Sequence, residues 1–368
     1  MRELVVVSLA LALGGALLFF AVGCGGGGDD SSSSADKSAP DASFDAAAQR
    51  FLDTYVTGDG RVQRADQGGD TVGEGQAYGM LIAVAIGDEQ RFDSIWSWAK
   101  DNIRRPDGLL SFLWKDGKVA DPEAASDADV DAARALLVAS CRFKKPAYKQ
   151  EALDLAKAIL DNETGSFQGS PVLVAGPWAT KDPITLNPSY FSPATFAALG
   201  KASGDGRWGS LSASGRSVTD ILMPNEGSLP PDWASVQKGK PVPIGAPGQT
   251  SGPGRFGFDA ARTLVRMAED PDPAGQRIAA KAWPAFEGKA PADIPVEHNL
   301  DGSPAGGTQH PMALVAAAGA AAAAGRDADK KKLLAAAEAL DKRSPTYYGA
   351  AWVALGRIML DSTALDCS

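Results

Sequence analysis

Apolar residues recur at helical spacing along almost the whole chain after residue 43, and this pattern limits the fold more than any other feature. Phe44, Ala48, Phe51 and Tyr55, for example, fall on one helical face. With this first helix, the periodicity predicts about twelve, the others near 74–87, 91–104, 127–141, 146–161, 192–202, 207–223, 257–269, 273–287, 307–324, 327–341 and 346–361. Strand signals are weak, so the sequence predicts an all-α fold.

The absence of a fixed sequence period argues against a repeat solenoid and favours helical hairpins closed into a ring. The segment 316–324 is almost entirely Ala around Gly319, which suits close helix–helix packing. An α/α barrel of two concentric helix layers fits, because its inner helices can be rich in small residues all round. The intervals 162–190 and 224–256 show little regular pattern, and unstructured loops of that length in a compact body are usually functional.

The N-terminal segment has the pattern of an export signal. Arg2 is followed by an apolar run over 4–23, then Cys24, then a stretch at 25–34 that contains only Gly, Asp and Ser. Residues 21–24 resemble a bacterial lipobox, in which the Cys is lipidated after cleavage. We therefore expect a signal peptide at 1–23, a lipid-attachment Cys with a flexible tether at 24–42, and a catalytic domain at 43–368. The alternatives are an uncleaved membrane anchor or a cleaved signal that leaves a secreted protein, and in each case the body lies outside the cytoplasm.

Composition excludes several function classes. Lys and Arg number 36 against 45 Asp and Glu, which gives a net charge of −9 and disfavours a nucleic-acid partner but not a neutral sugar polymer. Two His residues make a His-rich metal site improbable, and three Cys residues cannot form a disulfide framework or a four-Cys zinc site. Outside the cytoplasm, Cys141 and Cys367 could pair with each other.

Three acidic residues stand at the starts of predicted helices: Glu74 within GEGQAYGM (73–80), Asp127 within ASDAD (125–129) and Asp259 within FGFDAAR (256–262). Taken singly, each fits helix capping, since acidic side chains in the first turn interact favourably with the helix dipole. Two glycines flank Glu74, so another group could approach the backbone closely there.

In their order along the chain, these three segments resemble glycoside hydrolase family 8, whose members carry S-E-G-Q-x-Y-G-M, A-S-D-x-D and Y-D-A-x-R. Segments 186–191, 229–234 and 347–349 also resemble family motifs, so that the similarity runs from about 51 to 360. Three positions depart from the pattern: Gly73 replaces Ser, Phe258 replaces Tyr, and Leu264 stands where Pro is common. The resemblance implies an (α/α)6 barrel and an inverting endoglucanase.

The resemblance also implies roles for the acidic residues. Glu74 would be the general acid and Asp259 the general base, since inversion needs a protonated carboxyl at the glycosidic oxygen and an ionised one beside a water. Asp127 would hold the sugar by its hydroxyls, and the helix start should favour its ionised form. Arg262, three residues after Asp259 on one helix face, could keep that carboxylate ionised.

Two aromatic residues complete the expected site. Tyr190 would help near the attacking water, and Trp114 would stack on a sugar ring. Two carboxyls and a water suffice for the reaction, so no organic cofactor or metal is expected.

The sequence thus predicts an endo-acting hydrolase of β-1,4-glucan, in the manner of a cellulase. A chitosanase, a mixed-linkage glucanase or a xylanase of the same family, a carbohydrate-binding protein without catalysis, and an α/α-barrel uronate lyase remain as alternatives. Expected partners are the glucan and, through the N-terminal lipid or anchor, a membrane; the cellulose-synthesis machinery is a further possible partner, since synthesis-linked trimming and degradation both fit.

Overall fold

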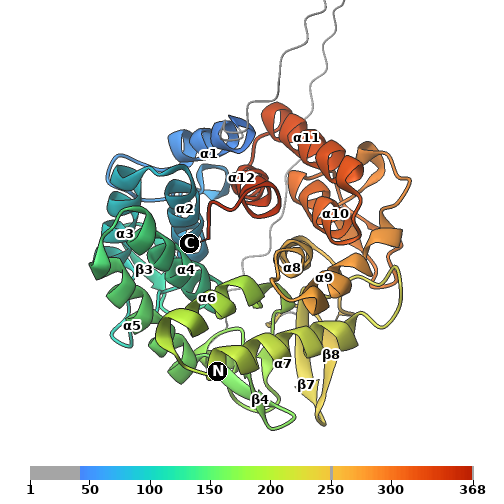
Figure 1. Cartoon of the computed structure of the whole chain (residues 1–368), viewed down its shortest axis with the longest axis horizontal. Helices are drawn as coiled ribbons and strands as arrows, with labels where there is room; N and C mark the ends of the chain where they lie inside the picture. Colours follow the sequence, from blue (N-terminus) through green and yellow to red (C-terminus); the bar gives the residue numbers. More distant parts are fainter. Residues whose placement is uncertain (1–41, 249–251, 367–368) are drawn as a thin grey trace, which may run out of the picture.

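Helices alternate between an inner ring and an outer layer in the computed structural model, which describes residues 42–248 and 252–366 (Figure 1). The inner helices contact one another in the order α2–α4–α6–α8–α10–α12 and back to α2, which closes the ring. Within the described residues the inner helices are α2 (Gly73–Ile86), α4 (Ser126–Arg142), α6 (Pro193–Ser203), α8 (Phe258–Ala268), α10 (Pro311–Ala323) and α12 (Tyr347–Asp361). The outer helices are α1 (Ala42–Tyr55), α3 (Glu89–Asn102), α5 (Pro146–Asn162), α7 (Arg207–Leu222), α9 (Pro273–Ala280) and α11 (Asp327–Arg343). The predicted (α/α)6 barrel is confirmed.

Small residues let the inner helices approach closely. In α10 the Ala-rich stretch is buried from Ala316 to Ala321, and a Cβ on Gly319 would lie 3.0 Å from the backbone oxygen of Leu264 in α8. The sequence expectation of tight helix packing at this stretch is therefore confirmed, and the barrel interior is filled by side chains.

Two helices are shorter than predicted, each because of a proline. Helix α10 begins at Pro311, because proline is favoured at the first position of a helix. The residues before it include a short strand. Helix α9 ends at Ala280, and a separate 3₁₀ turn at Trp283–Ala285 contains Pro284. Other 3₁₀ turns lie at Ala65–Gln67, Pro177–Ala179, Pro188–Tyr190 and Pro291–Asp293.

The two long intervals predicted to lack regular structure in fact contain antiparallel hairpins. In the first, β4 (Thr164–Phe167) pairs with β5 (Ser170–Leu173). In the second, β7 (Trp233–Gln237) pairs with β8 (Lys240–Ile244) and also with β6 (Thr185–Leu186), which joins the two intervals in one sheet. The remaining short strands of the described part are β1 (Thr71–Val72), β2 (Leu113–Lys115), β3 (Lys118–Asp121), β9 (Glu297–His298) and β10 (Pro304–Gly306).

The predicted signal, lipidation site and tether, including Cys24, lie outside the described residues. Across the part of the chain that is described, none of the helices combines the length and apolar character needed to cross a membrane. Cys141 is disulfide-bonded, and its predicted partner Cys367 also lies outside the described residues, so this pairing stays a prediction.

Candidate active site

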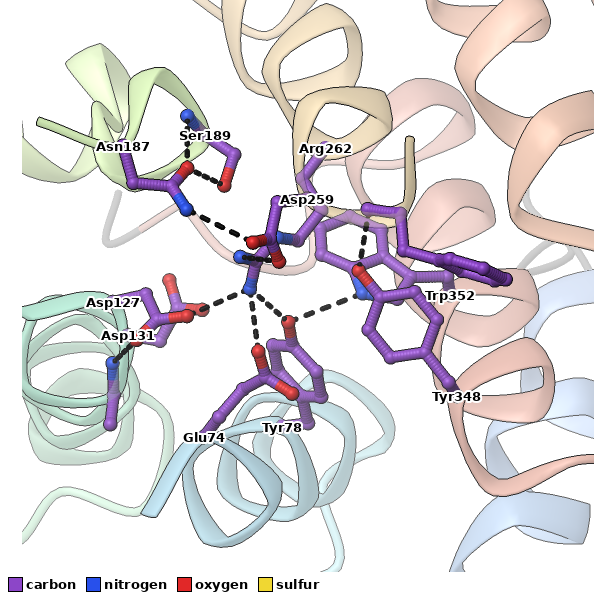
Figure 2. A network of polar contacts seen from close by, with 12 residues as sticks. Glu74, Tyr78, Asp127, Asp131, Asn187, Ser189, Asp259, Arg262, Tyr348 and Trp352 are labelled. Atoms are coloured by element: carbon purple, nitrogen blue, oxygen red, sulfur yellow. Dashed lines mark hydrogen bonds and ion pairs between the residues drawn. The ribbon is translucent and has the colours of Figure 1, made fainter. Parts of the chain in front are cut away.

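Each of the three predicted acidic residues is the second residue of an inner helix. Glu74 lies in the first turn of α2, Asp127 in that of α4 and Asp259 in that of α8. The inner helices are parallel to one another, so their N-termini lie at the same end of the barrel. The three carboxyls converge at that end (Figure 2).

Arg262 joins the three carboxyls. Its Nη1 donates to Glu74 Oε2 at 2.6 Å and to Asp127 Oδ2 at 2.7 Å, and its Nη2 donates to Asp259 Oδ1 at 2.8 Å. The Arg262 side chain is 1% exposed, so these charge-assisted bonds form away from water, where they are strong. The predicted contact between Arg262 and Asp259 is present, and the contacts to the other two carboxyls extend it across the barrel.

Burial dominates the protonation of two of these groups. It raises the pKa of Asp127 well above its ordinary value, against the opposing effect of Arg262, and it also raises the pKa of Asp259. The expectation that the helix start would favour an ionised Asp127 stays a prediction, because burial opposes its ionisation while the ion pair with Arg262 favours it. Asp259 is the most accessible of the three, with 32% of its side chain exposed against 20% for Glu74 and 2% for Asp127.

The close approach expected at the glycines beside Glu74 comes from within the protein. A Cβ on Gly75 would lie 2.6 Å from Tyr347 Oη, so only glycine admits the tyrosine at this point. Tyr347 is 1% exposed and lines the same cavity as Glu74.

A fourth carboxyl fixes the start of α8. Asp232 Oδ1 accepts hydrogen bonds from the backbone N–H groups of Gly257, at 3.1 Å, and Ala260, at 2.7 Å. It thereby fills the place of an N-cap side chain from a distant loop, and it holds the turn that carries Asp259. Burial, and then the charge of Asp259, raises the pKa of Asp232 to about 7.

The carboxyls open into a cavity of about 250 Å³. Its lining comprises the carboxyls, aromatic rings and a few polar groups: Arg64, Gln67, Val72, Glu74, Phe112, Ala125, Asp127, Tyr190, Trp233, Phe258, Asp259, Tyr347 and Tyr348. Tyr190 lies with its ring centroid 5.3 Å from Arg262 Cζ and 6.2 Å from the ring of Trp233. An acidic centre edged by aromatic faces suits a neutral sugar, whose rings stack on aromatic side chains and whose hydroxyls bind carboxylates.

Trp114 is not among the residues that line this cavity. It lies on β2, where its ring packs edge-on against Trp98 at 5.3 Å and under the guanidinium of Arg61 at 5.0 Å. Trp114 pairs with Thr71 of β1, and the next residue of that strand, Val72, lines the cavity. Its role as a sugar platform stays a prediction.

The contacts of three further residues at the site were not predicted from the sequence. Tyr78 Oη accepts from Arg262 Nη1 at 3.0 Å and from Trp352 Nε1 at 3.2 Å. Asn187 donates through Nδ2 to Asp259 Oδ2 at 3.1 Å, and Tyr348 Oη donates to the carbonyl of Phe258 at 2.9 Å. Tyr78 and Asn187 belong to the family-like segments GEGQAYGM and LNPSYF, so the motifs contained them without indicating their contacts.

Two further ion pairs join α4 to α8 and to the residue that follows α8. They lie about one and two helical turns after Asp127 and Arg262, farther from the helix starts. Arg266 donates to both carboxylate oxygens of Asp131 at 2.8 and 2.7 Å, and Arg134 does the same to Glu269 at 2.9 and 2.5 Å. We call the pairs Asp127–Arg262, Asp131–Arg266 and Arg134–Glu269 the ion-pair ladder. The ladder fastens the helix that carries Asp127 to the helix that carries Asp259.

Comparison with known proteins gives a consistent family. The sequence model described as "Glycosyl hydrolases family 8" matches residues 33–359. A probable endoglucanase of Novacetimonas hansenii is 34% identical over 235 residues, which are 60% of this chain and 67% of that protein. An endoglucanase of Cellulomonas uda is 29% identical over 254 residues, 66% of this chain and 68% of the relative.

A solved structure agrees with this. The endo-β-1,4-glucanase CMCax of Acetobacter xylinum superposes with a TM-score of 0.72 at 28% identity, covering 86% of this chain and 98% of the other. With the family match extending over nearly the whole described body, the chain belongs to glycosyl hydrolase family 8 and is a glycosidase.

Proposed function

We propose that the protein is an endo-acting hydrolase of β-1,4-glucan that inverts the anomeric configuration, with Glu74 as general acid and Asp259 as general base. The observation that carries the proposal is the meeting of Glu74, Asp127 and Asp259 on Arg262 at the mouth of one aromatic-edged cavity. The curated relatives named above are endoglucanases, which supports a glucan as substrate.

The charge balance of the site supports acid catalysis. Three ionised carboxylates around one guanidinium would leave two negative charges unbalanced in a largely buried site, which is unfavourable. A proton on one of the three carboxyls, as the proposed acid requires, relieves this repulsion and leaves the other two to share the charge of Arg262. A proton held at a site open to substrate is what a general acid requires.

In the proposed reaction, Glu74 protonates the glycosidic oxygen as the bond to the anomeric carbon breaks. A water attacks that carbon from the opposite face, and Asp259 takes its proton, so that the configuration inverts. The raised pKa of Asp259 makes it a stronger base than an ordinary aspartate. Asp127 holds sugar hydroxyls at the cleavage point, and Tyr190 lies beside the path of the water.

The first experiment measures reducing-end release from carboxymethylcellulose, chitosan, lichenan and xylan. We expect the wild type to prefer carboxymethylcellulose and to lower its viscosity early, as an endo-acting enzyme does. Glu74→Gln and Asp259→Asn should each reduce kcat by about 10²–10⁴-fold. The exposed Glu226→Gln serves as the matched control and should retain full activity. Wild-type activity in Glu74→Gln would refute its assignment as the acid, and NMR detection of products with retained configuration would refute Asp259 as a base acting through water.

We also propose that the protein is exported and anchored to the membrane through lipidated Cys24. The support is the sequence pattern at 1–34 alone. Wild-type protein should take up a labelled fatty acid and sediment with membranes, whereas Cys24→Ser should do neither. Equal labelling of the two would contradict the proposal.

A further inference from the structure

Two carboxyls that the proposed mechanism does not use lie together behind Asp127. Asp129 is in the first turn of α4, two residues after Asp127, and Glu163 directly follows α5. Both side chains belong to residues that are 0% exposed. A buried ionised carboxylate is costly unless a cation or several donors compensate it.

Compensation for this pair is scarce. Asp129 Oδ1 accepts from the backbone N–H of Leu110 at 2.9 Å, but among the described residues neither an N–H group nor a hydroxyl reaches Asp129 Oδ2 or either oxygen of Glu163. The side chains of Asp129 and Glu163 interact with each other, and a hydrogen bond between them contributes to the raised pKa of Glu163. One of them must therefore be the donor, and only a protonated carboxyl can donate.

The charged groups near the pair do not stabilise it in a form in which both carboxyls are ionised. They include the acids Asp127 and Asp107 and the cation Arg105. Arg105 donates to Asp107 at 2.8 Å, so its charge is already matched by another carboxylate. Burial and the neighbouring carboxylates raise the pKa of both Asp129 and Glu163 well above their usual range.

We propose that Asp129 and Glu163 share a proton in a carboxyl–carboxylate hydrogen bond that positions Asp127. The inference rests on the proposed function, in which Asp127 holds the sugar. Within it, Glu163 is a positioning residue that acts through the first turn of α4 and touches no substrate.

The backbone shows how the effect reaches Asp127. The carbonyl of Glu163 accepts from Val174 N at 2.9 Å, and the carbonyl of Val174 accepts from the hydroxyl of Ser126. Ser126 and Asp129 flank Asp127 in the same helical turn. The end of α5 and the β4–β5 hairpin therefore hold this turn on both sides of Asp127, once through Ser126 and once through the shared proton.

Loss of the shared proton at high pH places two carboxylates against each other and should loosen the turn. We therefore expect kcat/KM to fall on the alkaline side as the pair ionises. Glu163→Gln keeps a hydrogen-bond donor toward Asp129 but removes the titrating proton. It should retain kcat/KM within about threefold at pH 6 and lose part of the alkaline fall, whereas Glu163→Ala should raise KM about tenfold with a smaller change in kcat.

The controls separate positioning from general damage. Glu226→Gln should reproduce the wild-type pH profile, and Asp129→Asn should behave like Glu163→Gln. The proposal is overturned if Glu163→Gln has the wild-type alkaline limb, or if it loses as much activity as Glu163→Ala.

A second measurement does not need catalysis. Infrared difference spectra of the wild type should contain a protonated-carboxyl band at pH 7 that Glu163→Gln lacks, and the absence of that difference would also overturn the proposal. If the wild type and Glu163→Gln differ by this band but the wild type hydrolyses no glucan, the shared proton stands and the proposed function fails.

Discussion

Arg262 donates a hydrogen bond to Glu74 Oε2 at 2.6 Å and so ties the start of α8 to the start of α2 across the mouth of the barrel. The two residues are 188 positions apart in the chain. Since the same guanidinium also binds Asp127 and Asp259, a change at this one residue acts on all three carboxyls.

Replacing Arg262 should impair catalysis even when the charge is kept. A lysine ammonium cannot span acceptors that a planar guanidinium binds through two nitrogens, so Arg262→Lys should misplace the carboxyls and lower kcat/KM by about 10²-fold or more. Arg262→Met leaves Asp127 buried without its cation and should cost about 3–5 kcal/mol of unfolding free energy. Steady-state kinetics and urea unfolding measure the two effects, and wild-type kinetics in Arg262→Lys would contradict the expected misplacement.

The middle rung of the ion-pair ladder should behave as a coupled unit. Asp131→Leu and Arg266→Met should each cost about 3–5 kcal/mol, because each leaves a buried partner uncompensated. The double variant Asp131→Leu/Arg266→Met should cost clearly less than the sum of the two. The half-exposed pair Arg326–Glu287 is the matched control, and Glu287→Ala should cost at most about 1 kcal/mol. Additive costs in a urea double-mutant cycle at the buried pair would refute the coupling.

Asp232 should make the stability of the protein depend on pH. The pKa of Asp232 is about 7 in the folded state and about 4 in an unfolded chain. Between about pH 4 and pH 7 the folded state therefore binds a proton at this carboxyl that the unfolded state does not. The contribution of this group to stability is therefore fully present below about pH 4 and is lost as the pH rises through about 7. Asp232→Asn can keep both backbone bonds through Oδ1, and its unfolding free energy should fall less between pH 5 and pH 8.

The control for Asp232 is the alanine variant. Asp232→Ala loses both bonds to the start of α8 and should be less stable by about 1–2 kcal/mol at every pH. An unchanged pH dependence in Asp232→Asn would show that this carboxyl does not titrate in that range.

Asn187 should influence the pH at which kcat/KM falls on the acidic side. Its bond to Asp259 Oδ2 favours the ionised form and lowers the pKa of Asp259. Asn187→Ala should therefore raise that pKa, and the acidic limb of kcat/KM should move to higher pH. Ser189→Ala removes only the hydroxyl that holds Asn187 Oδ1 at 2.7 Å, so its shift should be smaller in the same direction. A shift to lower pH in Asn187→Ala would contradict the role of Asp259 as the base.

Local sequence patterns were sufficient to predict the helices and the helix starts that carry the three carboxyls. Helical periodicity and helix-start signals depend on neighbouring residues, and so does the spacing of three between Asp259 and Arg262. The bonds from Arg262 to Glu74 and Asp127 span 188 and 135 residues, and such distances leave no signal in spacing. The same holds for Asp232, which acts on α8 from 25 and 28 positions away.

The hairpins and the place of Trp114 were also beyond local patterns. Strands β5 and β8 contain Pro171, Pro241 and Pro243, and proline is a signal against strand formation. The residue type of Trp114 suits both a sugar platform and packing on a neighbouring side chain, and only the tertiary contacts with Trp98 and Arg61 place it.

The ion-pair ladder has a consequence for how this sequence can drift over generations. A lineage that replaced Asp131 before Arg266, or the reverse, would pass through a chain weakened by several kcal/mol, comparable with a large part of the stability of an ordinary domain. Related sequences should therefore either keep both side chains or have both replaced. Substitutions at these two positions should occur together, whereas the residues of exposed ion pairs should vary independently.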